Sequence, residues 1–152
     1  MGENPLILSR GEGALLKFIG ISTVIKVFSD DSDGAYSLIE STVSPRFDGF
    51  KPHIHQHMTE AFYILEGTLT FRVGEQSITA TPGSFILVPP GMVHTYGNPA
   101  DMPAKYLLLT SPGGFEQYLI ELAQMIEAEP QWPPVDMGKL NALAKKYDAT
   151  PA

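Results

Sequence analysis

The chain has 152 residues, of which 43% are hydrophobic, and its 17 Asp and Glu outweigh its 10 Lys and Arg to give a formal net charge of -7. This length suits one domain with a buried core, and the acidic balance argues against nucleic acid or an anionic membrane as a partner, because both require a basic face. The chain contains no cysteine, which excludes disulfides, thiolate metal ligands and a cysteine nucleophile. Neither a membrane-spanning apolar run nor an export signal is recognised, so a cytoplasmic location is the default expectation.

Residues 14–112 are predicted to form a β-barrel, preceded by a poorly ordered lead-in at residues 1–13. Short segments rich in β-branched and aromatic residues alternate with turn-forming Gly, Pro, Asn and Asp, which is the pattern of an all-β sandwich or barrel. The predicted strands are residues 24–28, 36–43, 61–65, 68–73, 77–80, 85–88, 93–96 and 106–110.

Two histidines on one face of an extended segment begin a candidate metal site. His53 and His55 are two residues apart, so the period of a β-strand places both side chains on the same face. Glu60 can join them if the chain turns over residues 56–59 and returns as a second strand. His94 follows a Pro-Gly turn and supplies a fourth donor. Three imidazoles and one carboxylate can hold a divalent metal with coordination positions left open.

Two segments resemble the two sequence motifs of the cupin family. The first motif, His-x-His-x4-Glu-x6-Gly, runs from His53 to Gly67. The resemblance implies an all-β fold, a double-stranded β-helix that forms a jelly-roll-like barrel, and it implies that the four residues of the candidate site are metal ligands. The second motif, Gly-x5-Pro-x-Gly-x2-His-x3-Asn, has its fixed residues at Gly83, Pro89, Gly91, His94 and Asn98.

The chain departs from the family pattern at one position before the first motif. The family often has a glycine six residues before the first histidine, and this chain has Phe47 there.

The four candidate ligands favour transition-metal ions over Mg²⁺ and Ca²⁺. Three imidazoles are poor ligands for the hard cations Mg²⁺ and Ca²⁺. Iron, nickel, manganese, copper, cobalt and zinc all remain compatible with it. His57 has the same strand parity, but a pair formed by His55 and His57 would lie too close to Glu60 for the family pattern, so we expect His57 to be a partly exposed loop residue. Asn98 is expected to hold a turn by side-chain hydrogen bonds.

Strand alternation also predicts a set of apolar side chains that face the barrel interior. A pocket of this kind suits a flat or aromatic ligand. Plain core packing accounts equally well for each residue taken singly. The predicted pocket residues are Phe62, Ile64, Phe71, Phe85, Leu87 and Tyr96.

After Pro112 the hydrophobic period becomes helical. Residues 114–127 are predicted to form an amphipathic helix, and a second, shorter helix is predicted to begin after Asp136 as its N-cap. We expect residues 113–152 to form a helical extension that packs on the outside of the barrel within the same domain. A helical lid over the barrel mouth is the alternative.

A closer likeness covers most of residues 14–150. The segments at 34–40, 60–67, 112–116 and 140–147 resemble bacterial single-domain cupins similar to quercetin 2,3-dioxygenase. This resemblance implies a metal-dependent dioxygenase that acts on a flavonol-like or other enolisable aromatic small molecule, with Glu60 as the catalytic base. The alternatives are a metal-dependent cyclase or isomerase and a non-catalytic small-molecule-binding cupin. The family also implies a homodimer.

Overall fold

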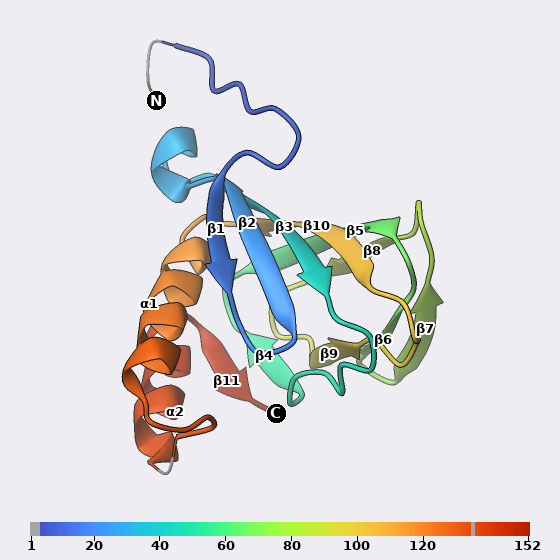
Figure 1. Ribbon diagram of the computed structural model, residues 1–152, viewed down its shortest axis with the longest axis vertical. Coiled ribbons are helices and arrows are strands. Elements are labelled where there is room, and N and C mark those ends of the chain that lie inside the picture. Colours follow the sequence, from blue (N-terminus) through green and yellow to red (C-terminus); the bar gives the residue numbers. More distant parts are fainter. Residues whose placement is uncertain (1–3, 135) are drawn as a thin grey trace.

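Alternating buried and exposed side chains build two antiparallel sheets in the computed structural model, which describes residues 4–134 and 136–152 (Figure 1). Every second residue of β3 is fully buried, as expected for a strand with one face on a core. The larger sheet contains, in order across it, β1 (Ala14–Lys17), β2 (Ile21–Val27), β3 (Ser37–Val43), β10 (Ala104–Ser111), β5 (Thr59–Glu66) and β8 (Phe85–Val88).

The smaller sheet carries all three histidines of the candidate site. They lie on neighbouring strands, with His53 directly opposite His94, while Glu60 reaches them from β5 of the larger sheet. The two sheets enclose the core, and this arrangement confirms the predicted double-stranded β-helix. The smaller sheet contains, in order, β11 (Ala149–Pro151), β4 (His53–His55), β9 (His94–Gly97), β6 (Leu69–Val73) and β7 (Gln76–Ala80).

Three elements were missed by the sequence prediction. β1 is a short edge strand that pairs with β2. A single 3-10 turn, η1 (Ser29–Ser32), occupies the predicted hairpin loop between β2 and β3. β11 follows the second helix and pairs with β4, with Ala149 opposite His55. The third of these matters most, because it brings the C-terminal residues to the candidate site.

The predicted inward orientation of Phe85 and Leu87 is wrong. Their side chains are 62% and 54% exposed, whereas Ile86 and Val88 are buried. The register explains the difference: Ile86 lies opposite Phe62, and Val88 lies opposite Glu60. Residues directly opposite in an antiparallel pair share one face of the sheet, so the inward orientation of β5 selects the even-numbered residues of β8.

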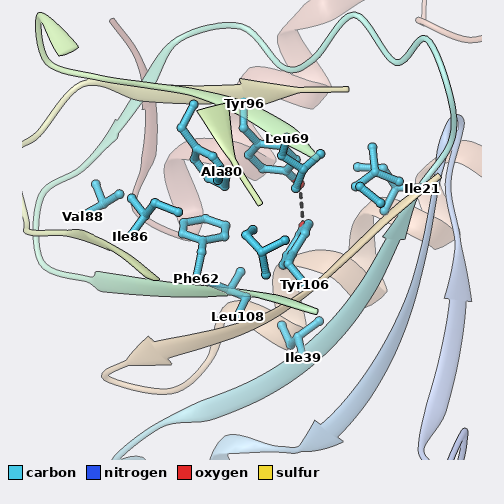
Figure 2. Close-up of a cluster of buried hydrophobic side chains, with 14 residues drawn as sticks. Ile21, Ile39, Phe62, Leu69, Ala80, Ile86, Val88, Tyr96, Tyr106 and Leu108 are labelled. Atoms are coloured by element: carbon cyan, nitrogen blue, oxygen red, sulfur yellow. Dashed lines mark hydrogen bonds between the residues drawn. The ribbon is translucent and has the colours of Figure 1, made fainter. Parts of the chain in front are cut away.

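Aromatic rings from both sheets meet in the core (Figure 2). Phe62 packs edge-on against Phe71, Tyr96 and Tyr106, with ring centroids 5.1–5.8 Å apart. The hydroxyls of Tyr96 and Tyr106 lie 2.5 Å apart and hydrogen-bond to each other, which satisfies two polar groups inside an apolar cluster.

The glycine that ends the first motif is required by a close backbone approach. Gly67 has a φ of 70°, a conformation that L side chains rarely adopt. A Cβ added there would lie 2.4 Å from the carbonyl oxygen of Pro103. The turn between β5 and β6 therefore admits only glycine, which is a structural reason for this position of the motif.

Two helices follow the barrel, α1 (Phe115–Ala128) and α2 (Met137–Lys146), and Figure 1 shows them together beside β1 and β11. Asp136 is the predicted N-cap of α2, and its carboxylate accepts a hydrogen bond from the backbone nitrogen of Gly138 at 2.9 Å. Phe115 and Leu119 of α1 pack against the core cluster. Within the described ranges, neither helix is long and apolar enough to cross a membrane.

Candidate metal centre

Three histidines and one glutamate converge between the two sheets. β4 supplies His53 and His55, β9 supplies His94, and β5 supplies Glu60. One candidate ligand atom from each residue lies within 4.8 Å of the others. His53 is half-buried, while the other three residues are at most 3% exposed. The fold thus brings together all four residues that the sequence singled out.

Backbone carbonyl groups orient the three imidazole rings. Each Nδ1 lies 3.0 Å from a carbonyl oxygen: that of Lys51 for His53, Asp148 for His55 and Met92 for His94. Because a carbonyl oxygen can only accept, each neutral ring donates from Nδ1 and keeps its lone pair on Nε2. Second contacts of this kind fix the tautomer of metal-ligating histidines, so the site presents three Nε2 lone pairs.

The Glu60 carboxylate lies close to two of these nitrogens. Its Oε2 is 2.7 Å from Nε2 of His94 and 3.6 Å from Nε2 of His55. These three atoms are buried and have no hydrogen-bond partner of good geometry. Two acceptors this close require a cation between them, either a proton or a metal ion.

The pKa values of the histidines reflect the same arrangement. Burial lowers the pKa of His94, but its contacts with the Glu60 carboxylate outweigh burial and raise it above the usual value. Burial dominates at His53 and lowers its pKa, which favours the neutral ring that can bind a metal.

The donors fit a divalent transition ion. Imidazole nitrogens and a carboxylate suit zinc, copper, iron and nickel. Ligand atoms about 2.1 Å from such an ion lie roughly 3 Å apart when they are adjacent in its coordination shell, and the contact between Glu60 and His94 is close to that spacing. The buried, unpartnered Nε2 and carboxylate atoms are the groups that such an ion would satisfy.

Thr110 is a buried neighbour of Glu60 that sequence reasoning did not identify. It lies directly opposite Glu60 in the pairing of β10 with β5, and its hydroxyl oxygen is buried without a hydrogen-bond partner. The two residues therefore share one face of the sheet. A threonine in a strand is so common that the sequence contains no signal for this position.

The first turn of α1 lies beside the cluster. The ring of Phe115 contacts the ring of His55 edge-on, with centroids 6.0 Å apart, and also packs against Tyr118. Elsewhere α1 contacts β1 and β3 of the larger sheet. The ring of Phe115 therefore places an aromatic side chain beside the candidate ligand His55.

The predicted pocket residues divide into two groups. Phe62, Ile64, Phe71 and Tyr96 are buried in the core, where they are compatible with both a pocket floor and plain packing. Phe85 and Leu87 point to the outside and cannot line an interior pocket. A hollow of about 560 Å³ borders Tyr96 but includes none of the four clustered residues, because it lies outside the smaller sheet beside Phe50, Thr70 and Arg72.

The remaining sequence expectations concern two loop residues. The side chain of His57 is 84% exposed and lies outside the cluster. Asn98 is buried, and its amide donates to the carbonyl oxygens of Ser44 at 3.1 Å and Met102 at 2.9 Å while its oxygen accepts from the backbone of Ala100. The side chain of Asn98 thus holds a turn, as predicted.

Comparison with known proteins gives relatives that are similar in sequence. Quercetin 2,3-dioxygenase of Bacillus subtilis strain 168 is 32% identical over 135 residues, which are 86% of this chain and 40% of that protein. The chain spans less than half the length of each of the curated relatives reported, which include a germin-like protein of Arabidopsis thaliana at 26% identity over 45% of its length.

Solved structures agree on the fold. KdgF from Halomonas superposes with a TM-score of 0.65 at 15% identity, covering 75% of this chain and 99% of that one. The polyketide cyclase RemF from Streptomyces resistomycificus superposes with a TM-score of 0.61 at 19% identity, covering 69% and 78% of the two chains. Residues 40–110, which include both motifs and the four clustered side chains, match the cupin domain family. With two cupin motifs, a double-stranded β-helix and these relatives, the chain belongs to the cupin superfamily.

Proposed function

We propose that this cupin is a metal-dependent dioxygenase that acts on a flavonol-like or other enolisable aromatic compound, with His53, His55, Glu60 and His94 as its metal ligands. The cluster carries the proposal, because it brings three imidazoles and one carboxylate together. The Nε2 atoms of His55 and His94 and Oε2 of Glu60 are also buried without a hydrogen-bond partner of good geometry. The 32% identity to a quercetin 2,3-dioxygenase over most of this chain supports the reaction class.

A divalent transition ion held there would supply an electrophilic centre for the oxyanion of the substrate and, if redox-active, would permit reaction with dioxygen. Glu60 is placed to accept the hydroxyl proton of the substrate, since its carboxylate is buried within the cluster. Phe115 and the buried aromatic residues would exclude water from an aromatic substrate.

A metal-dependent cyclase or isomerase is the second candidate. The observation that favours it is the buried carboxylate of Glu60, which can accept and return a proton without any oxidant. Turnover without dioxygen, or with zinc as the only metal, would favour this candidate. A non-catalytic small-molecule-binding protein is the outcome if a ligand raises the melting temperature of a protein that binds no metal.

The test begins with elemental analysis of protein purified without a metal-chelating tag. We expect near-stoichiometric iron, nickel, manganese, copper or cobalt in the wild type and a loss of it in His94→Ala and Glu60→Ala. Glu75→Ala is the matched control for Glu60→Ala, because Glu75 is exposed in the β6–β7 turn and lies outside the cluster. An oxygen electrode then measures uptake with flavonols: one dioxygen consumed per substrate supports the dioxygenase, and substrate loss without uptake contradicts it.

We also propose that the protein is a homodimer in the cytoplasm. The outer face of the larger sheet supports self-association, because the exposed side chains of Tyr63, Phe85, Leu87 and Leu109 adjoin one another there. Tyr63 lies opposite Phe85, and the half-buried Ala61 lies opposite both Leu87 and Leu109. These five side chains carry no charge in a chain of net charge -7. Two copies can therefore meet on this face with little electrostatic repulsion.

A further inference from the structure

Asp148 joins the C-terminus to the turn between β4 and β5. Its carboxylate accepts hydrogen bonds from three consecutive backbone nitrogens, those of Gln56 at 3.0 Å, His57 at 2.8 Å and Met58 at 3.2 Å. The ring of His57 adds a contact at 3.2 Å. One aspartate thus satisfies the donors of the whole turn, from a position about 90 residues later in the chain.

The same residue contacts a candidate ligand through its backbone. The carbonyl oxygen of Asp148 lies 3.0 Å from Nδ1 of His55. β11, which begins at the next residue, pairs with β4 and places Ala149 opposite His55. The turn after β4, the strand β4 itself and the ring of His55 are therefore all held by the segment around Asp148.

This support distinguishes His55 from the other two histidines. His53 and His94 direct Nδ1 to a carbonyl oxygen only two residues earlier, so their own strands set their tautomers. His55 depends on a carbonyl from the C-terminal segment. If that segment moves, His55 loses the acceptor that keeps its proton on Nδ1 and leaves its Nε2 free for a metal.

The backbone of Asp148 has a left-handed conformation. Its φ is 64°, a region that aspartate, asparagine and glycine tolerate better than other residues. This conformation lets the carbonyl reach His55 while the side chain reaches the turn, and the three hydrogen bonds to the carboxylate offset its cost.

We propose that Asp148 is a positioning residue of the metal centre: its carboxylate clamps the β4–β5 turn, and through this clamp its carbonyl group holds His55 with Nε2 directed at Glu60 and His94. This inference rests on the proposed metal site and deepens it. Asp148 is not one of the four clustered residues, so it would act on the site through the β4–β5 turn and the orientation of His55.

Two substitutions of Asp148 remove all or some of the contacts of its carboxylate and leave its backbone carbonyl group in place. Asp148→Gly tolerates the left-handed conformation and keeps the carbonyl group, but it removes every carboxylate contact. Asp148→Asn keeps the size and one acceptor oxygen, while its NH₂ group meets a backbone donor. Asp33→Gly is the matched control, because Asp33 also has a left-handed backbone, with φ 52°, but lies in the β2–β3 connection.

Two measurements test whether Asp148 affects metal binding and the orientation of His55. Titration of the metal-free protein with Co²⁺, against a chelator of known affinity, gives the dissociation constant and the visible absorption spectrum of the bound ion. Long-range ¹H–¹⁵N correlation spectra of the metal-free protein, recorded well above the usual histidine pKa, give the tautomer of His55.

We expect Asp148→Gly to weaken Co²⁺ binding by about 10–100-fold and to change the Co²⁺ spectrum, with Asp148→Asn between it and the wild type. Asp33→Gly should retain the affinity and the spectrum of the wild type. In the metal-free protein, His55 should carry its proton on Nδ1, and this preference should weaken in Asp148→Gly.

Unchanged Co²⁺ affinity and spectrum in a folded Asp148→Gly would overturn the inference and leave the metal site standing. If the wild type itself binds no Co²⁺ or other transition ion, the proposed function fails, and the tautomer of His55 then decides the positioning role alone. An Nδ1 proton on His55 that is unaffected in Asp148→Asn and Asp148→Gly would reject that role.

Discussion

The carboxylate of Glu116 accepts two hydrogen bonds from Ser29, 87 residues earlier in the chain: one from the backbone nitrogen at 2.8 Å and one from the hydroxyl at 2.6 Å. The hydroxyl of Ser37 and the backbone nitrogen of Gly114 donate to its other oxygen. Glu116 is fully buried, and the preceding residue, Phe115, contacts His55. This carboxylate therefore fixes the first turn of α1 against the barrel next to the candidate metal centre.

Replacing this carboxylate by an amide should destabilise the protein. Glu116→Gln removes the charge and turns an NH₂ group toward groups that themselves donate, which we expect to lower the free energy of unfolding by about 2–3 kcal/mol. Urea denaturation at neutral pH measures the loss. Glu75→Gln makes the same chemical change at an exposed residue of the β6–β7 turn and should have little effect.

Glu116 also predicts how the free energy of unfolding changes with pH. Burial raises the pKa of Glu116, but the hydrogen bonds from Ser29 and Ser37 outweigh burial and lower it below the ordinary value of 4.5. The stability that Glu116 contributes is therefore complete above pH 4.5 and is lost as the pH falls through the lowered pKa. The difference in unfolding free energy between wild type and Glu116→Gln should shrink in acid, and a constant difference would contradict this assignment.

The hydroxyl pair inside the core should behave as one unit. Tyr96→Phe and Tyr106→Phe each remove the hydrogen bond between the two buried hydroxyls, so each should cost about 1–3 kcal/mol, with Tyr96→Phe at the lower end because Tyr106 keeps its hydrogen bond with Ser41. The double variant should cost less than the sum of the two. A double-mutant cycle in urea measures this coupling. Additive costs would show that the 2.5 Å contact between the two hydroxyls contributes nothing.

These two tyrosines should also resist ionisation. Burial is the main cause that raises the pKa of Tyr106 to about 12 and that of Tyr96 well above its usual value of 10. Ionising either group is less favourable in the folded protein, so stability should fall as the pH rises above 10. Ultraviolet titration should show fewer than the six tyrosines ionising before the protein unfolds.

The register of β8 gives a pair of contrasting substitutions. Ile86→Ala should lower the free energy of unfolding by about 2–4 kcal/mol, because it leaves a cavity opposite Phe62. Leu87→Ala, at an adjacent outward residue, should cost less than about 1 kcal/mol. Denaturation at low protein concentration compares the two, and the reverse order would show that the register is shifted by one residue.

The apolar outer face predicts the effect of a charge on assembly. Phe85→Glu should convert the proposed dimer to a monomer, because it places one carboxylate of each copy in an uncharged interface. Light scattering coupled to size exclusion gives the mass. Phe50→Glu, at an exposed phenylalanine before β4, is the control and should leave the mass unchanged. A monomeric wild type would reject the dimer itself.

The sequence by itself determined the family, most of the strands and the four clustered residues. The spacing of His53 and His55 places both on one face of a strand. These signals are local: strand parity, turn chemistry and helix capping act within a few residues, as at Asp136.

Only the tertiary structure decided the rest. Phe85 and Leu87 face outward because β8 takes its orientation from its pairing with β5, and no local feature sets that register. Asp148 reaches His55 and the β4–β5 turn from the far end of the chain, so the sequence around it contains no sign of its partners. Local periodicity can predict which residues form a strand, but contacts between distant segments depend on how the sheets pair and close, and that is fixed only when the whole barrel folds.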